Sequence, residues 1–292
     1  MMLLTRDEMA FDFKGAKFDR VKDRDLLAWI ASQFLYGEVT GIQVGHWILH
    51  APDVESAKFL ARQCIEELQH VDVFMEFFKW LDARPVKVHP VVKFLSSESD
   101  DWYEHCALEM AQGEGFVLMV FYAIIHCIDD EKLAKRLDAA ARQEEGHVEF
   151  GEQQTMKALA RDPKLRKRLL GLHLLSLWVV KRFEKWIARR VDQDHPVMRQ
   201  IPEYLKTIIA TTDMRLQRMG MTSKPLSEYG RLETFARISG AVMRKVLRKF
   251  AFWRWFSKKR LTHTYLRDEY LAEVMKLKEI ENAAGIPVIK AA

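Results

Sequence analysis

The chain has 292 residues, of which 49% are hydrophobic and 30% charged, and its net charge is +5. This is the composition of an ordinary soluble globular protein. The sequence contains no zinc-finger spacing, P-loop or dinucleotide fingerprint, so we expect no nucleic-acid partner.

Three cysteines, Cys64, Cys106 and Cys127, are widely spaced and form no C-x-x-C pair. Such an odd, scattered set is not a disulfide framework, and it favours a reducing compartment. The sequence begins with no apolar run long enough for a signal peptide. The longest apolar stretch, 116–128, is shorter than the roughly 20 residues of a membrane span. We therefore expect a cytoplasmic protein.

Apolar residues recur with helical spacing along the chain, and no segment alternates as a strand does. The sequence therefore predicts an all-α protein. Four long helices are expected first, at about 24–50, 52–82, 101–128 and 130–160, and then others at 163–191, 197–219, 228–256 and 260–282. A connection at 83–99, broken by Pro85 and Pro90, separates the second helix from the third. We expect an N-terminal segment, a four-helix bundle and a C-terminal helical extension packed on it, at 1–24, 25–160 and 161–292.

The pattern E-x-x-H occurs twice in the predicted bundle. The first copy is Glu67 with His70, in CIEELQH, and the second is Glu144 with His147, in RQEEGHVEF. Residues i and i+3 lie on one face of a helix, so a carboxylate and an imidazole at this spacing can reach one metal ion or one pair of ions. A single copy is weak evidence, because 41 acidic residues and 10 histidines make a chance occurrence easy.

An isolated glutamate precedes each copy by a similar distance. Glu38 lies 29 residues before Glu67, and Glu114 lies 30 residues before Glu144. Each glutamate and the E-x-x-H motif that follows it lie on the two helices of one predicted hairpin. Both are about 13–16 positions from the turn of that hairpin, or roughly 20–24 Å along each helix. The side chains therefore come level across each helical hairpin. The connection at 83–99 could stretch to roughly 55 Å, which lets the third helix run parallel to the second.

Two other glutamates compete for these positions. Glu66 lies four residues before His70 and could also face the site, and Glu109 could replace Glu114. Glu109 points about 140° away from Glu114 on an α-helical wheel, so Glu114 is preferred. The alternative without a metal is a solvated acidic face with histidines in the core. The large apolar neighbours argue against it, because buried carboxylates without a cation are very costly.

The chain resembles the ferritin-like di-iron or di-manganese carboxylate superfamily. The shared features are four helices, one long crossover, two glutamates and two E-x-x-H motifs. The resemblance covers roughly residues 25–160 and implies a ferritin-like four-helix bundle with additional C-terminal helices. It implies two bound Fe ions, or Mn and Fe, bridged by Glu67 and Glu144. Both histidines would donate their second ring N–H to acceptors outside the ligand set. The implied metal-binding and catalytic residues are Glu38, Glu67, His70, Glu114, Glu144 and His147.

Within this superfamily, EEGHVEFGE and GEGFVLMVFYAI are similar to strings in aldehyde-deformylating oxygenases. The resemblance implies activation of O2, electrons from a ferredoxin or reductase, and oxidation of a small or lipophilic organic substrate. The C-terminal part departs from those oxygenases, so their substrate is not carried over. The alternatives are an erythrin-like peroxide reductase and a non-enzymatic metal-binding or iron-handling protein. We expect a homodimer.

Glycines flank the predicted ligands at six positions: Gly37, Gly41, Gly45, Gly113, Gly115 and Gly146. Close helix packing explains some of them. We also expect a cavity beside the metals, above all at Gly146, because glycine inside a helix costs roughly 0.5–1 kcal/mol relative to alanine. Tyr36 and Tyr122 are eligible by position for a radical role, but Tyr36 is two residues from Glu38 and so points elsewhere on the helix. Core packing with a satisfied hydroxyl is the more usual role of both. Three further histidines are expected in the core or at the surface: His46, His50 and His173.

The segment 231–260 holds ten basic residues and one acidic residue. From 242 to 250 the apolar residues form one arc of the predicted helix and the basic residues the other. Such a helix, with Trp253 and Trp255 beyond it, suits an anionic membrane surface, an acidic ferredoxin or an acyl-carrier protein. It equally suits a helix that packs on the bundle and keeps a solvated basic face.

Overall fold

The computed structural model describes residues 2–90, 99, 101–189 and 192–249. Every regular element in these ranges is a helix, which confirms the predicted all-α class. The helix expected at 260–282, like Trp253 and Trp255, lies outside the described residues.

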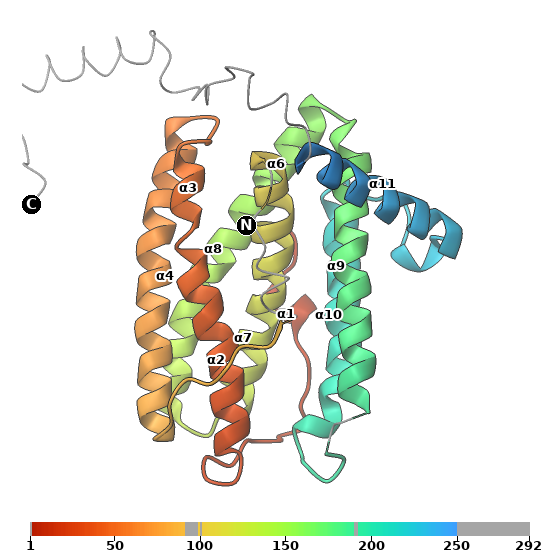
Figure 1. Cartoon of the computed structure of the whole chain (residues 1–292). Helices are drawn as coiled ribbons and strands as arrows, with labels where there is room; N and C mark the ends of the chain where they lie inside the picture. Colours follow the sequence, from red (N-terminus) through yellow and green to blue (C-terminus); the bar gives the residue numbers. More distant parts are fainter. Residues whose placement is uncertain (1, 91–98, 100, 190–191, 250–292) are drawn as a thin grey trace, which may run out of the picture.

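Four long helices lie side by side in a bundle (Figure 1). They are α2 (Arg24–Gly41), α4 (Val54–Leu81), α7 (Gly115–Cys127) and α8 (Glu131–Arg161). In the core, Phe34 stacks on Phe74 with ring centroids 5.2 Å apart and meets Phe121 edge-on at 5.0 Å. Each buried ring stabilises the fold by about 1.5–3 kcal/mol, so these contacts hold α2, α4 and α7 together.

Aspartates fix where two of these helices begin. Asp53 accepts a hydrogen bond from the Ser56 amide at 2.7 Å, and Asp130 accepts one from the Leu133 amide at 2.8 Å. Each carboxylate satisfies an amide that has no partner within its own helix. Because α4 and α8 begin at these caps, the register of their inward-facing residues is set from the first turn.

The described part of the long connection lies along α2. The Val86 amide donates to Ser32 Oγ and the His89 amide donates to Gln33 Oε1, both at 2.8 Å. In Figure 1 the chain crosses the bundle here, and the next long helix runs in the same direction as α4. The third helix of the bundle is therefore parallel to the second, as the length of the connection predicted.

The helix predicted at 24–50 is interrupted, which corrects that boundary. α2 ends at Gly41, and the short helix α3 (Val44–Ile48) follows after two residues. Helical spacing of apolar residues continues through the break, which is why periodicity alone missed it.

The helix predicted at 101–128 is continuous but is not α-helical throughout. It consists of α6 (Trp102–Glu104), the π-helix η1 (His105–Glu114) and α7. Gly151 of α8 lies against η1, where a Cβ atom would be 2.6 Å from the Ala111 amide nitrogen and 2.8 Å from the Cys106 carbonyl oxygen. A side chain at residue 151 would push η1 away, so this glycine lets the wide π-helix pack closely on α8.

The helices α9 (Leu165–Ala188) and α10 (Ile201–Arg218) run beside the bundle (Figure 1). Arg215 of α10 and Glu152 of α8 form a buried ion pair, 2.9 Å between Nε and Oε1. Gly115 leaves the space that the Arg215 guanidinium occupies. Removing either partner of such a pair leaves an uncompensated buried charge, so the pair fixes α10 against the bundle.

The remaining elements are short or lie at the end of the described chain. They are α1 (Arg6–Met9), η2 (Met198–Gln200), η3 (Leu226–Glu228) and α11 (Arg231–Lys249). The division of the chain into three parts stays a prediction.

One helix within the described ranges, Trp102–Cys127, is long and apolar enough to cross a membrane by length and composition. The apolar run 116–128 that the sequence singled out covers the second half of this helix. Half of its most apolar window is buried inside the protein, as in the core helix of a soluble bundle. The cytoplasmic location stays a prediction.

Candidate metal centre

All six predicted ligands converge inside the bundle. Glu38 comes from α2, Glu67 and His70 from α4, Glu114 from the last position of η1, and Glu144 and His147 from α8. Their potential ligand atoms form two groups, each within 4.8 Å: Glu38, Glu67, His70 and Glu144 in one, and Glu67, Glu114 and His147 in the other. Glu67 belongs to both groups. Five of the six are at most 4% exposed, and Glu114 is partly exposed.

Glu144 lies between the two histidines. Its Oε1 is 3.0 Å from His70 Nδ1, and its Oε2 is 3.3 Å from His147 Nδ1. His70 Nδ1 also donates to Glu38 Oε2 at 3.0 Å, and His147 Nδ1 is 3.6 Å from Glu67 Oε1. The Nδ1 atoms of both imidazoles therefore face the carboxylates at the centre of the cluster.

The opposite nitrogen of each histidine donates to the other motif. His70 Nε2 donates to Gln143 Oε1 at 2.9 Å, and His147 Nε2 donates to Glu66 Oε2 at 2.8 Å. Gln143 and Glu66 each lie four residues before the histidine of their own motif, so the repeat is [E/Q]-E-x-x-H. The sequence implied an acceptor for the second ring N–H of each histidine but did not identify it. The structure gives Gln143 of α8 for His70 and Glu66 of α4 for His147, so each motif provides the acceptor for the histidine of the other. Such partners fix the ring orientation of a metal-binding histidine.

Burial and mutual repulsion raise the pKa of three carboxyl groups. Burial is the largest cause for Glu38, Glu67 and Glu114, and the negative charge of Glu144 adds to it. Glu144 behaves differently: burial opposes its ionisation, yet the adjacent histidines lower its pKa to about 2. A divalent cation among these groups would stabilise the ionised carboxylates that repel one another without it.

The histidines respond to the same charges. Burial alone would lower the pKa of His70, but hydrogen bonds to Glu144 and Glu38 raise it to about 11. Burial likewise opposes the charged form of His147, and the neighbouring Glu144 and Glu66 raise its pKa well above the usual value. The Nδ1 atoms that face these carboxylates are the atoms through which the two imidazoles would bind a cation.

Three buried atoms in the cluster make no hydrogen bond within the described chain: Glu114 Oε2, Glu144 Oε2 and His147 Nδ1. Unsatisfied buried polar atoms are rare in native proteins, because each costs about 1–3 kcal/mol. All three belong to potential ligands, and the donor set of carboxylate oxygens and imidazole suits iron or manganese. The residues thus fit a metal ion, although the identity of that metal is not fixed by them.

The competing glutamate Glu109 has partners outside the cluster. Glu109 Oε2 accepts from His105 Nδ1 at 2.5 Å and Glu109 Oε1 accepts from the Ser99 amide at 2.6 Å, so Glu109 does not join the cluster. Glu114 Oε1 instead accepts from Gln63 Nε2 at 2.8 Å. Gln63, one turn before Glu67, was not singled out from the sequence. It is fully buried and also lies 3.3 Å from Glu67 Oε1.

The glycines act differently from the expectation. A Cβ atom on Gly41 would lie 2.5 Å from Glu67 Oε2, so the missing side chain at this position makes room for the carboxylate shared by both groups. At Gly146 an added Cβ would meet no atom within 4 Å. A channel at Gly146 stays a prediction, whereas Gly41 has a direct contact with a predicted ligand.

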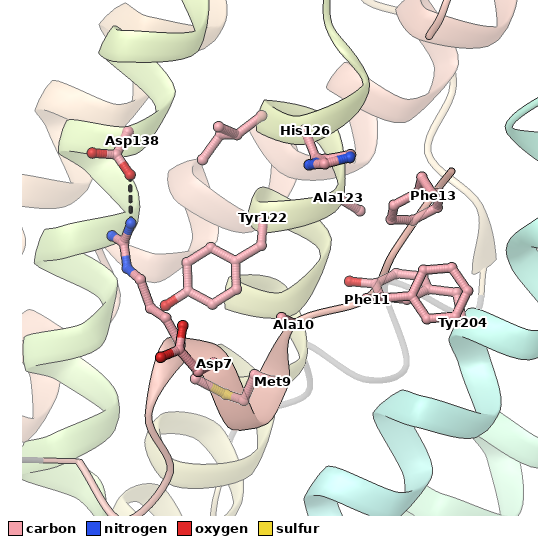
Figure 2. Close-up of a pocket in the computed structure, with 12 residues that line it drawn as sticks. Asp7, Met9, Ala10, Phe11, Phe13, Tyr122, Ala123, His126, Asp138 and Tyr204 are labelled. Atoms are coloured by element: carbon pink, nitrogen blue, oxygen red, sulfur yellow. Dashed lines mark hydrogen bonds and ion pairs between the residues drawn. The ribbon is translucent and has the colours of Figure 1, made fainter. Parts of the chain in front are cut away.

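Other predicted residues lie outside the cluster. The Tyr122 hydroxyl donates to Glu145 Oε1 at 2.8 Å, and His173 is a fully buried histidine that donates to Gln112. Figure 2 shows Tyr122 lining a cavity of about 250 Å³ between the N-terminal segment, α7, α8 and α10. None of the six predicted ligands lines this cavity, so it is separate from the candidate metal centre.

No protein-family profile, curated protein or solved structure matches the chain. The chemistry of the cluster must therefore be inferred from its own residues and geometry.

Replacing Gly41 with alanine should weaken metal binding. The new methyl group would displace Glu67 Oε2, whereas Gly146→Ala, in the middle of α8, meets open space. We expect Gly41→Ala to lower metal affinity by about tenfold or more, and Gly146→Ala to keep the affinity and add about 0.4–1 kcal/mol of stability. Metal titration and urea unfolding measure both. Equal affinities for the two variants would contradict the role of Gly41.

Removing the acceptors of the histidine N–H groups should also weaken metal binding. We expect Gln143→Ala and Glu66→Ala each to lower metal affinity about 10–100-fold. Gln153→Ala is the control, because Gln153 is an exposed residue of α8 that bonds to Glu149. Isothermal titration with Fe(II) or Mn(II) measures the change. If all three variants bind alike, the reciprocal hydrogen bonds do not orient the histidines for metal.

Proposed function

We propose that this chain is a ferritin-like di-iron carboxylate protein that activates O2 to oxidise a small or lipophilic organic substrate. The observation that carries the proposal is the convergence of two E-x-x-H motifs and two further glutamates in the core of a helical bundle. This is the donor arrangement of di-iron and di-manganese carboxylate bundles, with one glutamate from each of two helices and one Glu-x-x-His from each of the others.

The two groups of donors would hold one ion each. Glu38 and His70 belong to one group, Glu114 and His147 to the other, and Glu67 to both. Glu67 would therefore help to hold both ions. Glu144 would also help to hold both ions, because each of its oxygens faces the Nδ1 of a different histidine.

Iron is favoured over softer metals, since four of the six donors are carboxylates. When bound, two ferrous ions would supply the electrons that reduce O2. A ferredoxin or a reductase would restore those electrons between turnovers. The Mn and Fe combination is compatible with the same donors.

The residues of this chain prepare the site by controlling protons. Binding through Nδ1 requires His70 and His147 to release the protons that now point at Glu38 and Glu144. Gln143 and Glu66 retain the Nε2 protons, so each imidazole keeps a single orientation. Metal uptake should therefore release protons to solvent.

Aromatic rings exclude water from two sides of the cluster. Phe121 lies 6.5 Å from His70, and Phe59 lies 6.2 Å from His147, measured between ring centroids. A dry setting strengthens electrostatic interactions and limits side reactions of reactive oxygen. It supports an oxidase or oxygenase more than an iron store, whose metal must exchange freely.

Oxygen uptake by the Fe(II)-loaded protein tests the proposal. We expect anaerobically loaded protein to consume O2 as its ferrous ions are oxidised, and to incorporate isotopically labelled oxygen into members of a panel of lipophilic substrates when a reductant is supplied. Glu144→Ala should lose more than about 90% of this uptake, because it removes the central carboxylate. Glu131→Ala, an exposed carboxylate on the same helix, should retain it.

The alternatives give different results in the same experiment. Faster oxidation by hydrogen peroxide than by O2, without oxygen uptake, would indicate an erythrin-like peroxide reductase. Slow oxidation by both oxidants would indicate a metal-binding or iron-handling protein. Either result contradicts the oxidase proposal.

A further inference from the structure

The helix α11 turns its apolar side away from the protein. Its contact with α9 is made at Gly171, where an added Cβ would be 2.6 Å from the Arg237 carbonyl oxygen and 2.7 Å from Ala241 Cβ. Ala241 is 2% exposed, so this small residue marks the inward side of α11. Large side chains on the other side remain exposed.

The exposed apolar residues form one arc. Leu232 is 86% exposed, Phe235 70% and Met243 58%. At 100° per residue these positions and Val242, Val246 and Leu247 all lie on the half of the helix opposite Ala241. They extend from residue 232 to 247, or roughly 22 Å along the helix. An exposed apolar strip of this length on a surface helix, interrupted only near Ser239, marks an interaction site.

Positive charge is concentrated in the same element. The segment Arg231–Lys249 contains six basic residues and one acidic residue, a net charge of +5 that equals the net charge of the whole chain. The other residues of the chain are therefore balanced in charge. The exposed residues Arg231 and Arg244 lie near the two margins of the apolar arc, and their long side chains can extend sideways while the arc is covered.

We propose that α11 is a membrane-docking helix that lies flat on an anionic lipid bilayer. Its apolar arc would enter the boundary between headgroups and acyl chains, and its flanking arginines would contact anionic headgroups. Charge complementarity selects this occupant, because Arg231 and Arg244 flank the apolar arc and the acidic residue Glu233 is neutralised by Lys224 and Arg237. The helix also carries a net charge of +5. The inference goes beyond the proposed function and requires no metal.

Docking would present a defined end of the molecule to the bilayer. Lys245 Nζ lies 3.7 Å from Glu104 Oε2 of α6, and Arg168 of α9 pairs with Asp101 beside it at 2.6 Å. α11 is thereby tied to the end of the bundle where α6 begins, as Figure 1 shows. That end would face the lipid.

Sedimentation of the full chain with lipid vesicles tests the proposal. We expect binding to vesicles of phosphatidylcholine and phosphatidylglycerol in equal parts to be at least about tenfold tighter than to phosphatidylcholine alone, and to weaken as salt is added. The double variant Phe235→Glu, Met243→Glu should weaken binding by at least about tenfold. Both side chains are largely exposed, so the variant should fold, which circular dichroism checks.

Val21→Glu is the matched control, because Val21 is 81% exposed in the loop before α2 and should leave vesicle binding unchanged. The proposal is overturned if the wild type stays in solution with anionic vesicles, or if the double variant binds as the wild type does. It is also overturned if the wild type is a dimer that the double variant makes monomeric, since the arc would then be a protein interface.

Discussion

Four carboxyl groups and two imidazoles are buried at the centre of this bundle, and their mutual electrostatics constrains the elements around them. Without a cation, burial and repulsion raise the pKa of Glu38, Glu67 and Glu114, and the neighbouring carboxylates raise the pKa of both histidines. A protein that gained nothing from this cluster would be more stable with an apolar core in its place. The π-helix ends at Glu114 and Gly41 leaves room for Glu67, whereas the capped starts of α4 and α8 set the register that turns Glu67 and Glu144 inward.

The cluster has an approximate twofold arrangement, and its departures from symmetry distinguish the two groups of potential ligands. Each [E/Q]-E-x-x-H motif supplies a carboxylate and an imidazole and accepts a hydrogen bond from the histidine of the other motif. Glu38 contacts the histidine of its own half, whereas Glu114 contacts Gln63 and ends a π-helix. Glu114 is also the partly exposed member.

The sequence predicted the helical class, the extents of α4 and α8, and all six members of the cluster, because helical periodicity and the E-x-x-H spacing are local patterns. The break after Gly41 and the π-helix were missed, because both depend on packing between helices, as the contact of Gly151 with η1 illustrates. The sequence could show that Gln143 and Glu66 each precede a histidine by four residues. It could not show that each accepts a hydrogen bond from the histidine of the other helix, because that pairing depends on how α4 and α8 pack. For α11, the wheel separated apolar from basic residues, yet only the contact at Gly171 and Ala241 shows which side faces the protein.

The most direct test of a buried metal centre is the metal content of the folded chain, measured by plasma mass spectrometry after loading with Fe(II) or Mn(II) and removal of unbound ions. Two ions per chain are expected for the wild type and for Glu131→Ala, and far less than one for Glu144→Ala. A folded wild type that retains no transition metal under either loading condition would contradict the account, because the cluster would then be a buried network of shared protons.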